Sequence, residues 1–333
     1  MSFLLAEASS PSPADTVAVV MAGGEGSRLR PLTQEQAKPA IEFVHGLRII
    51  DFALSNLANS GVRRVLVAVQ YKPASLIDHL RRFWQPFFVN AGGELVIAGP
   101  GIDADIERFE GTADAVGRLM GRVGAWRPKT VSVFAADHVY RMDVRQFLAE
   151  HHARRATATI AALTVPQAEA SEFGVLVTDR RGRVVEFQEK PAQPRVIPDR
   201  PGECFVSMGN YVFDAARFGG ILERARLAGH TDFGRDVLPA LLAHASVHAY
   251  DFSANRLARA AHGERTVYWR DVGTLPALDA ARREMSGRQP AFSLDDAAWP
   301  VPSFRAPAPA RAPVARVERA AREPMLGSAA LVV

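Results

Sequence analysis

The sequence predicts an α/β protein whose sheet is largely parallel. Apolar runs of strand length alternate with helical patterns along most of the 333 residues, and these runs are nearly continuous in aliphatic residues. Strands of a parallel sheet are buried on both faces, so they appear as continuous apolar segments. A cluster of glycines directly follows the first run, which ends at Met21. Because ligands of open α/β sheets bind at the carboxyl ends of the strands, this cluster marks a candidate binding site.

The expected strands cover residues 16–22, 64–70, 94–98, 131–136, 157–165, 174–178, 184–189, 206–213 and 247–252. The expected helices cover residues 49–60, 74–84, 112–122, 144–155, 215–226, 234–243 and 275–285. Thr112, Asp143 and Thr274 stand near helix starts, where side-chain oxygens can cap free N–H groups. Three regions follow from this pattern: a mobile leader over 1–15, an α/β domain over 16–290, and an Ala/Pro/Arg-rich tail over 291–333.

Composition narrows the classes of function. The chain is 48% hydrophobic and 23% charged, which is enough for one large core or two modest domains. No apolar run is long enough to span a membrane, and the chain does not begin like a secretory signal. The single cysteine, Cys204, rules out an intrachain disulfide and fits a reducing, cytoplasmic location. The net charge of +4 comes without the basic and aromatic clusters of nucleic-acid-binding proteins, so we expect neither a nucleic-acid nor a membrane partner.

The glycine cluster has the chemistry of a polyphosphate site. Residues 22–29 read Ala-Gly-Gly-Glu-Gly-Ser-Arg-Leu, and Lys38 follows shortly after them. Gly23, Gly24 and Gly26 allow the backbone to turn tightly and to direct its N–H groups to one point. Arg28 and Lys38 add two positive charges. Backbone donors and cations at the end of a strand suit a nucleoside triphosphate.

Two familiar glycine motifs are excluded by residue identity. A P-loop would continue with Gly-Lys-Ser/Thr, but Gly26 is followed by Ser27 and Arg28. A dinucleotide-binding fingerprint would place a third glycine where Leu29 stands. A simple glycine turn between a strand and the next element remains the structural alternative.

The pattern Gly-Gly-x-Gly-Ser-Arg-Leu, with Lys38 and Pro39 after it, resembles the sugar-phosphate nucleotidyltransferases. Further segments resemble the ADP-glucose pyrophosphorylase (glucose-1-phosphate adenylyltransferase) branch of that family, in the same order along the chain. They include residues 48–56, 59–63, 111–116, 137–140, 189–191, 207–209, 232–234 and 269–273. The resemblance implies a Rossmann-like mixed, mostly parallel sheet flanked by helices, which is the nucleotide-diphospho-sugar transferase fold.

The resemblance also implies a reaction: transfer of AMP from ATP to α-D-glucose 1-phosphate, giving ADP-glucose and pyrophosphate for glycogen or α-glucan synthesis. Two alternatives stay open, namely another base or sugar (dTTP or GTP), or a non-catalytic regulatory paralogue that binds sugar nucleotides. Members of the family typically continue into a left-handed β-helix that supports assembly and regulation, which leaves a homo-oligomer open. Residues 324–328 resemble the start of that domain, and the chain ends at Val333.

The resemblance assigns the site residues by role. Two anions must meet in this reaction. Two unit charges about 4 Å apart repel by ~4 kcal/mol at an effective dielectric constant of about 20. The site must therefore supply positive charge and alignment. The catalytic residues would be Arg28, Lys38, Asp137 and Lys190. The nucleotide-binding residues would be Gly23, Gly24, Gly26, Ser27, Gln70, Phe109, Gly111 and Thr112. The sugar-phosphate-binding residues would be Gly174, Glu189, Lys190 and Ser207, and Mg²⁺ would be held by Asp137 and Asp271.

Structural alternatives exist for several of these residues. Each aspartate could instead cap a turn, and the pair Glu189 and Lys190 could be an ordinary surface ion pair. The chain also departs from the family pattern. Phe109 stands where tyrosine is usual, Glu110 where a basic residue is common, and Ala136 where glycine precedes the metal aspartate. The last two departures leave a catalytically weak paralogue open as an alternative.

Overall fold

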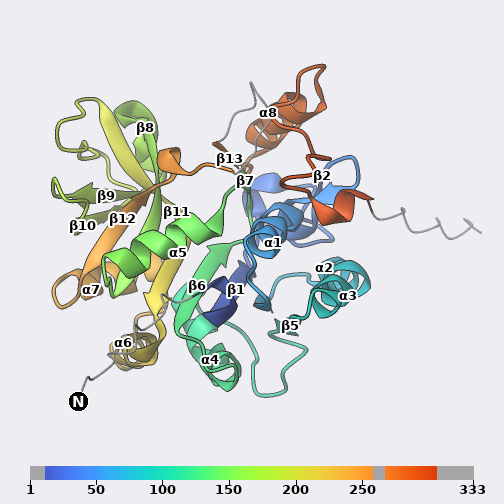
Figure 1. Cartoon of the computed structure of the whole chain (residues 1–333), viewed down its shortest axis with the longest axis horizontal. Coiled ribbons are helices and arrows are strands. Elements are labelled where there is room, and N and C mark those ends of the chain that lie inside the picture. Colours follow the sequence, from blue (N-terminus) through green and yellow to red (C-terminus); the bar gives the residue numbers. More distant parts are fainter. Residues whose placement is uncertain (1–11, 258–266, 306–333) are drawn as a thin grey trace, which may run out of the picture.

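The computed structural model describes residues 12–257 and 267–305. A nine-stranded sheet runs through the centre of the molecule (Figure 1). Its main strand order is β10-β9-β11-β6-β1-β4-β5, and β8 pairs with both β11 and β12. The strands are β1 (Thr16–Ala22), β4 (Arg64–Val69), β5 (Glu94–Ala98), β6 (Thr130–Ala135), β8 (Ala158–Pro166), β9 (Gly174–Thr178), β10 (Val184–Glu189), β11 (Glu203–Asp214) and β12 (Val247–Asp251).

The N-terminal half of the sheet is parallel, as its continuous apolar strands predict. β1 pairs in parallel with β4 and β6, and β4 pairs in parallel with β5. Val17, Val19 and Val20 of β1 are fully buried. Alternate residues of a strand point to opposite faces, and Val19 accordingly joins one core cluster while Val20 joins another.

The C-terminal half turns the sheet into a mixed one. β11 pairs antiparallel with β6, β8 and β9, and β9 pairs antiparallel with β10. The register of β11 against β8 shifts between Ser207 and Tyr211, and Gly209 in this bulge has a φ of 70°. Bulges re-aim side chains next to binding sites, and this one turns β11 where it passes the cavity described below. The expected mixed α/β fold is confirmed.

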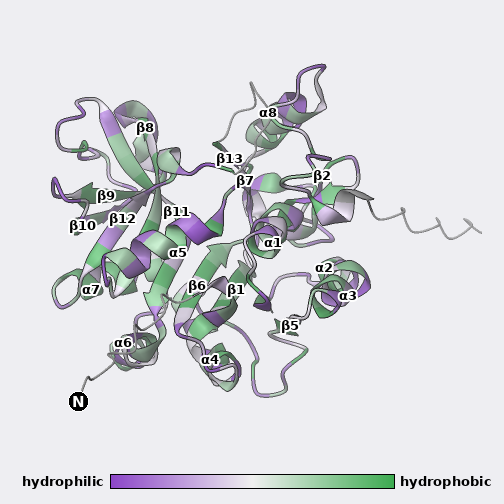
Figure 2. Cartoon of the chain, viewed as in Figure 1, coloured by the Kyte–Doolittle hydropathy of each residue, from purple (hydrophilic) through white to green (hydrophobic). Residues whose placement is uncertain are grey.

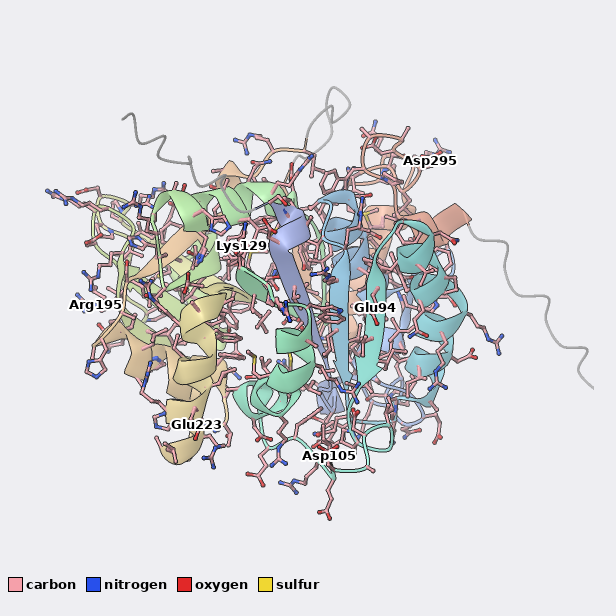
Figure 3. All side chains as sticks on the ribbon, turned by 60° about the horizontal axis from the view of Figure 1, so that its bottom comes forward. Glu94, Asp105, Lys129, Arg195, Glu223 and Asp295 are labelled. Atoms are coloured by element: carbon pink, nitrogen blue, oxygen red, sulfur yellow. The ribbon has the colours of Figure 1, made fainter. Side chains whose placement is uncertain are left out.

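Helices cover both faces of the sheet (Figure 1). They are α1 (Ile49–Asn59), α2 (Ala74–His79), α3 (Gln85–Asn90), α4 (Thr112–Ala125), α5 (Val144–Ala153), α6 (Ala215–Leu227), α7 (Leu238–Leu242) and α8 (Leu275–Ser286). Apolar residues of α4, α6 and α7 share one core cluster, and those of α1, α2, α3 and α5 share the other. Figure 2 shows the hydrophobic colour concentrated in the central strands. In Figure 3 labelled charged side chains such as Arg195 and Asp105 lie at the outer edge.

Two expected helices differ in detail from the structure. The segment expected over 74–84 continues through a π turn, Leu80–Trp84, into α3, and the segment expected over 234–243 begins with a π turn, Phe233–Val237. Each π turn comes directly before the first turn of a helix that contains proline, Pro86 or Pro239. Proline has no N–H to donate to the carbonyl four residues earlier, so the helix widens there.

Four short strands were not expected. β2 (Glu42–Val44) pairs with β3 (Leu47–Arg48), and β7 (His138–Arg141) pairs antiparallel with β13 (Tyr268–Asp271). Each of them contributes residues to a third core cluster at the α8 end of the molecule, which includes Leu29, Phe52 and Tyr268. Elements of two to four residues have no measurable periodicity, so sequence patterns do not reveal them.

The packed domain continues past the expected boundary at residue 290. Phe292, Trp299 and Val301 are buried, and Asp296 forms an ion pair with the buried Arg141 at 2.6 Å. At the other end of the chain, residues 13–15 form a short 3₁₀ helix before β1. The expectations for residues 1–11 and 306–333 lie outside the described residues. Within 12–257 and 267–305, no helix is long and apolar enough to cross a membrane.

Candidate active site

Two adjoining cavities lie where the strands β1, β4 and β6 end. The smaller, of about 530 Å³, is lined by the glycine loop and the segment before α4, and the larger, of about 1110 Å³, by β9, β10, β11 and β13. The smaller cavity contains Gly23, Gly24, Gly26, Ser27, Lys38, Gln70, Phe109 and Gly111; the larger contains Gly174, Glu189, Lys190, Ser207 and Asp271; Arg28, Thr112 and Asp137 line both. Every site residue that the resemblance implied therefore lines one or both of these two cavities.

The glycine loop packs closely against its neighbours. Gly26 has a φ of 65°, and a Cβ there would lie 3.0 Å from Cβ of Lys38 and from Cγ2 of Thr33. A Cβ on Gly23 would lie 3.2 Å from Cβ of Gln70, whereas one on Gly24 would meet nothing within 4 Å. Gly26 is therefore needed for the left-handed turn and the close approach of Lys38, and Gly24 borders open space.

Gln70 holds the far wall of the smaller cavity in place. Its Nε2 donates to the backbone carbonyl of Phe109 at 3.2 Å, and its Oε1 accepts the N–H of Phe109. Both ends of the amide are thus engaged by the same residue. Gln70 therefore positions the loop that precedes α4.

The start of α4 is fastened to the segment before α7. A Cβ on Gly111 would lie 2.3 Å from the carbonyl oxygen of Thr231, and the N–H groups of Ala113 and Asp114 donate to that same oxygen. The hydroxyl of Thr112 donates to Asp232 at 2.9 Å and accepts the N–H of Phe233 at 3.0 Å. Gly111 is therefore required by close backbone contact, because any side chain would collide with the carbonyl.

Four ionisable side chains meet at the junction of the two cavities. Antiparallel pairing of β7 with β13 places Asp271 opposite His138. Nζ of Lys38 lies 3.0 Å from Oδ2 of Asp137 and 3.6 Å from Oδ1 of Asp271. Nδ1 of His138 lies 3.3 Å from Oδ1 of Asp137, and Nε2 of His138 lies 3.9 Å from Oδ1 of Asp271. The side chain of Lys38 is only 7% exposed, so the two carboxylates share a largely buried cation.

The environment keeps Asp137 ionised. Removal from water opposes its charge, but the neighbouring His138 and Lys38 outweigh that effect and hold the pKa of this carboxyl well below its usual range. Arg28 adds a further cation at the same place. A Cβ on Gly273 would lie 2.9 Å from Oδ1 of Asp271 and 3.1 Å from Nη2 of Arg28. The junction therefore combines two carboxylates with two permanent positive charges.

The two carboxylates fit the donor set of Mg²⁺. This ion prefers hard oxygen ligands, binds through one or two carboxylates, and keeps water or substrate phosphate at its other positions. In the described ranges 12–257 and 267–305 there is no group of three or more His, Cys, Asp or Glu side chains that could hold a metal. Asp137 and Asp271 would thus bind Mg²⁺ only together with substrate oxygens or water, not in a closed protein cage.

In the larger cavity, two glycines make room for a carboxylate. Cβ atoms built on Gly174 and Gly234 would lie 3.2 Å and 3.3 Å from Oε2 of Glu189. A Cβ on Gly174 would also lie 2.5 Å from Cζ of Phe187, so this strand-start glycine is needed for packing as well. Partial burial, opposed by the charge of Lys190, raises the pKa of Glu189 above its ordinary value.

Lys190 and Ser207 complete the larger cavity. Lys190 is exposed, follows the last residue of β10 and adopts a φ of 45°, a left-handed conformation that is uncommon outside glycine. Its N–H donates to the carbonyl of Phe173 at 3.1 Å, which fixes the turn. Ser207 lies at the bulge in β11, where its hydroxyl accepts the N–H of Gly209 at 3.2 Å.

Two residues of the site received no role from the sequence. Asp232 lines both cavities and is bonded to Thr112, and Trp269 lines the larger cavity with its ring centroid 5.1 Å from that of His138. Both stand inside segments that carry the family resemblance, 232–234 and 269–273, so their position in those segments was the available signal. What the pattern did not reveal was that both face the ligand cavities.

A sheet with a glycine-rich loop after its first strand, cations over that loop and two carboxylates beside it defines a nucleotide-binding transferase. The model of the nucleotidyl transferase family matches residues 17–287, and this chain belongs to that family. The chain is thus an enzyme of the nucleotidyltransferase class.

Curated relatives place the chain more narrowly within the family. It is 42% identical over 288 residues to a glucose-1-phosphate adenylyltransferase of Thermodesulfovibrio yellowstonii, and the aligned region covers 86% of this chain and 70% of the relative. It is 42% identical over 294 residues to the enzyme of that name from Anaeromyxobacter dehalogenans, with the same coverage. It is 40% identical over 303 residues to glucose-1-phosphate adenylyltransferase 1 of Vibrio vulnificus, which covers 89% of this chain and 73% of the relative.

Proposed function

We propose that this chain transfers AMP from ATP to α-D-glucose 1-phosphate and releases ADP-glucose and pyrophosphate. The observation that carries the proposal is the junction of the two cavities, where Nζ of Lys38 lies 3.0 Å from Oδ2 of Asp137 and 3.6 Å from Oδ1 of Asp271. The similarity to glucose-1-phosphate adenylyltransferases supports the choice of substrates. The product would feed glycogen or a related α-glucan, and the buried single cysteine, Cys204, fits a cytoplasmic location.

ATP would bind in the smaller cavity. The N–H groups of the glycine loop would face the triphosphate, with Arg28 near its β- and γ-phosphates and Lys38 near its α-phosphate. Gly111 and Thr112 border the same cavity on the wall that Gln70 holds, and this wall would frame the base and ribose. The exposed Ser27, which also lines this cavity, would donate a hydrogen bond from its hydroxyl to a phosphate oxygen.

Glucose 1-phosphate would bind in the larger cavity. The carboxylate of Glu189 suits paired hydrogen bonds from sugar hydroxyls, because both of its oxygens accept. Lys190 would hold the phosphate as a flexible point charge. Gly174 and Ser207 would line the sugar, since both border this cavity.

The chemistry needs alignment more than acid–base catalysis. An oxygen of the sugar phosphate forms a bond to the α-phosphorus of ATP, the bond from that phosphorus to the bridging oxygen of the β-phosphate breaks, and pyrophosphate leaves with the electron pair. The attacking oxygen is already ionised, so no general base is required. Lys38 and Arg28 would stabilise the charge on the α-phosphate and on the leaving group. Mg²⁺ held by Asp137 and Asp271 would neutralise phosphate charge.

The test is pyrophosphate release with glucose 1-phosphate and each of ATP, dTTP and GTP. We expect turnover with ATP, and we expect Asp137→Asn to lower kcat by about 10²- to 10³-fold, because the variant loses a metal carboxylate at the reacting centre. Asp105→Asn is the matched control, since this exposed carboxylate lies outside both cavities, and it should leave kcat unchanged. Preference for dTTP or GTP would move the chain to another branch, and absence of turnover with every pair would favour a regulatory paralogue.

A further inference from the structure

Lys38 occupies the position at which both proposed metal carboxylates converge. Its nitrogen lies 3.0 Å from Oδ2 of Asp137 and 3.6 Å from Oδ1 of Asp271, and its side chain is only 7% exposed. A buried ammonium is stable only when it is paired, and here its partners are the two carboxylates that would hold the metal. Lysine and metal therefore compete for the same ligands.

The two cations cannot share this position. Mg²⁺ binds carboxylate oxygens at about 2.0–2.1 Å, which is well inside the spacing that now separates these oxygens from the nitrogen. A divalent ion and an ammonium group at such separation repel strongly when both are largely removed from water. The metal can bind tightly only after the ammonium group has moved away from the carboxylates.

The glycine loop offers Lys38 a second position. The base of the side chain is anchored there, because a Cβ on Gly26 would lie 3.0 Å from Cβ of Lys38. Lys38 also lines the smaller cavity together with Gly23, Gly24 and Arg28. The four-carbon stem of lysine is flexible, so its ammonium group can swing from the carboxylates toward a triphosphate held over the loop.

We propose that Lys38 is a placeholder for the divalent cation: it neutralises Asp137 and Asp271 until nucleotide phosphates draw it away, so that metal and nucleotide bind cooperatively. This inference rests on the proposed function, because it takes the triphosphate as the competing partner. By linkage, the nucleotide must raise the affinity for the metal by the same factor by which the metal raises the affinity for the nucleotide. Such a device keeps the metal site closed to free cations.

The experiment measures Mn²⁺ binding to the full chain without nucleotide, by electron paramagnetic resonance of the free ion. Lys38→Gln removes the competing ammonium, and we expect it to bind Mn²⁺ at least about 10-fold more tightly than the unchanged protein, within the range usual for coupled sites. Lys38→Arg keeps a cation between the carboxylates and should bind Mn²⁺ as weakly as the unchanged protein. The double variant Lys38→Gln/Asp271→Asn should lose the gain, because one of the carboxylates is gone.

Lys190→Gln is the control for general electrostatics. It removes the same charge from the adjoining cavity, and no ion pair links Lys190 to either metal carboxylate among the described residues, so the affinity for Mn²⁺ should change by less than about threefold. A second measurement guards against misfolding: Mn²⁺ should raise the thermal unfolding midpoint of Lys38→Gln more than that of the unchanged protein. The proposal is overturned if Lys38→Gln binds Mn²⁺ no more tightly than the unchanged protein does. It is also overturned if Lys190→Gln gains as much Mn²⁺ affinity as Lys38→Gln. Pyrophosphate release tests the proposed function separately.

Discussion

The two cavities share Arg28 and Asp137 but are built in different ways. The walls of the smaller cavity are fixed by contacts within the protein. Lys38 is buried and ion-paired, Gln70 forms two hydrogen bonds with the backbone of Phe109, and Gly111 packs closely against a backbone carbonyl. In the larger cavity the charged residues Glu189 and Lys190 are exposed. The difference indicates that the smaller cavity, where we propose that ATP binds, is preorganised by packing. The larger cavity, where we propose that glucose 1-phosphate binds, presents side chains that a ligand must order.

This contrast has a consequence for mutation. A substitution in the locked walls should cost both stability and activity, because the residue belongs to the packing of the domain. A substitution among the exposed side chains of the larger cavity should change binding of one substrate and leave the fold intact.

Gly111→Ala should have the largest effect. Its Cβ would lie 2.3 Å from the carbonyl oxygen of Thr231, so the loop before α4 must move away from the segment that carries Asp232. We expect a loss of about 1–3 kcal/mol in the free energy of unfolding, together with a fall in kcat/KM for ATP of about 100-fold or more. Chemical denaturation and pyrophosphate release measure the two quantities.

Gly117→Ala in the same helix is the matched control for Gly111→Ala. A Cβ there would meet nothing within 4 Å, so the change should stabilise α4 by about 0.5–1 kcal/mol and preserve activity. If Gly111→Ala proved as stable and as active as Gly117→Ala, the nucleotide side would not depend on this close contact.

Lys190→Ala should raise KM for glucose 1-phosphate by about 10- to 100-fold, because one charge-assisted contact to the phosphate would be lost. The side chain is exposed and the turn is held by its backbone N–H, so the unfolding midpoint should not move. Steady-state kinetics with either substrate varied would measure the effect. An equal rise in KM for ATP would show that the two cavities do not separate the substrates as their architecture indicates.

Acid pH should weaken sugar binding through Glu189. Its pKa is raised above the ordinary value of 4.5, mainly by burial, so this carboxylate takes up a proton earlier than usual as the pH falls. KM for glucose 1-phosphate should therefore rise by about threefold to tenfold as the pH drops through that pKa. In Glu189→Gln this part of the pH dependence should be absent, because the amide does not titrate. If both proteins gave the same KM profile, Glu189 would not bind the sugar as a carboxylate.

Gln70→Ala should have the smallest effect on activity but a clear effect on stability. It removes both bonds to the backbone of Phe109, and we expect a loss of about 1–2 kcal/mol in the free energy of unfolding. The fall in kcat/KM for ATP should be only severalfold, since Gln70 acts through the loop. Should Gln70→Ala instead destroy ATP turnover while the stability stayed constant, the residue would contact the nucleotide directly.

Much of this architecture was predictable from local patterns. The expected bounds of β1, β5, β9 and β10 coincide with the structure, because each is an uninterrupted or alternating apolar run followed by a turn. The glycine loop was identifiable because three glycines directly follow the first apolar run and two cationic residues, Arg28 and Lys38, come after them. Bounds of helices were less predictable where proline interrupts the hydrogen-bond ladder, at Pro86 and Pro239.

The centre of the site was predictable only through resemblance. Asp137 follows a long buried strand, which marks it as a residue at the sheet edge, but nothing local marks Asp271. It reaches Asp137 because two four-residue strands, β7 and β13, pair across more than a hundred residues of chain. Likewise, the two hydrogen bonds between the side chain of Gln70 and the backbone of Phe109 depend on how β4 and the loop before α4 approach each other.

The sequence by itself determined the alternation of strands and helices, the buried faces and the polyphosphate chemistry of the first loop, since these depend on neighbouring residues and on short-range periodicity. The tertiary structure alone decided that a lysine pairs with two distant aspartates, that Glu189 lies close to Gly174 and Gly234, and that two cavities share Arg28, Thr112 and Asp137. The physical reason is that charge pairing and close packing act across space, between segments whose separation along the chain carries no local signal.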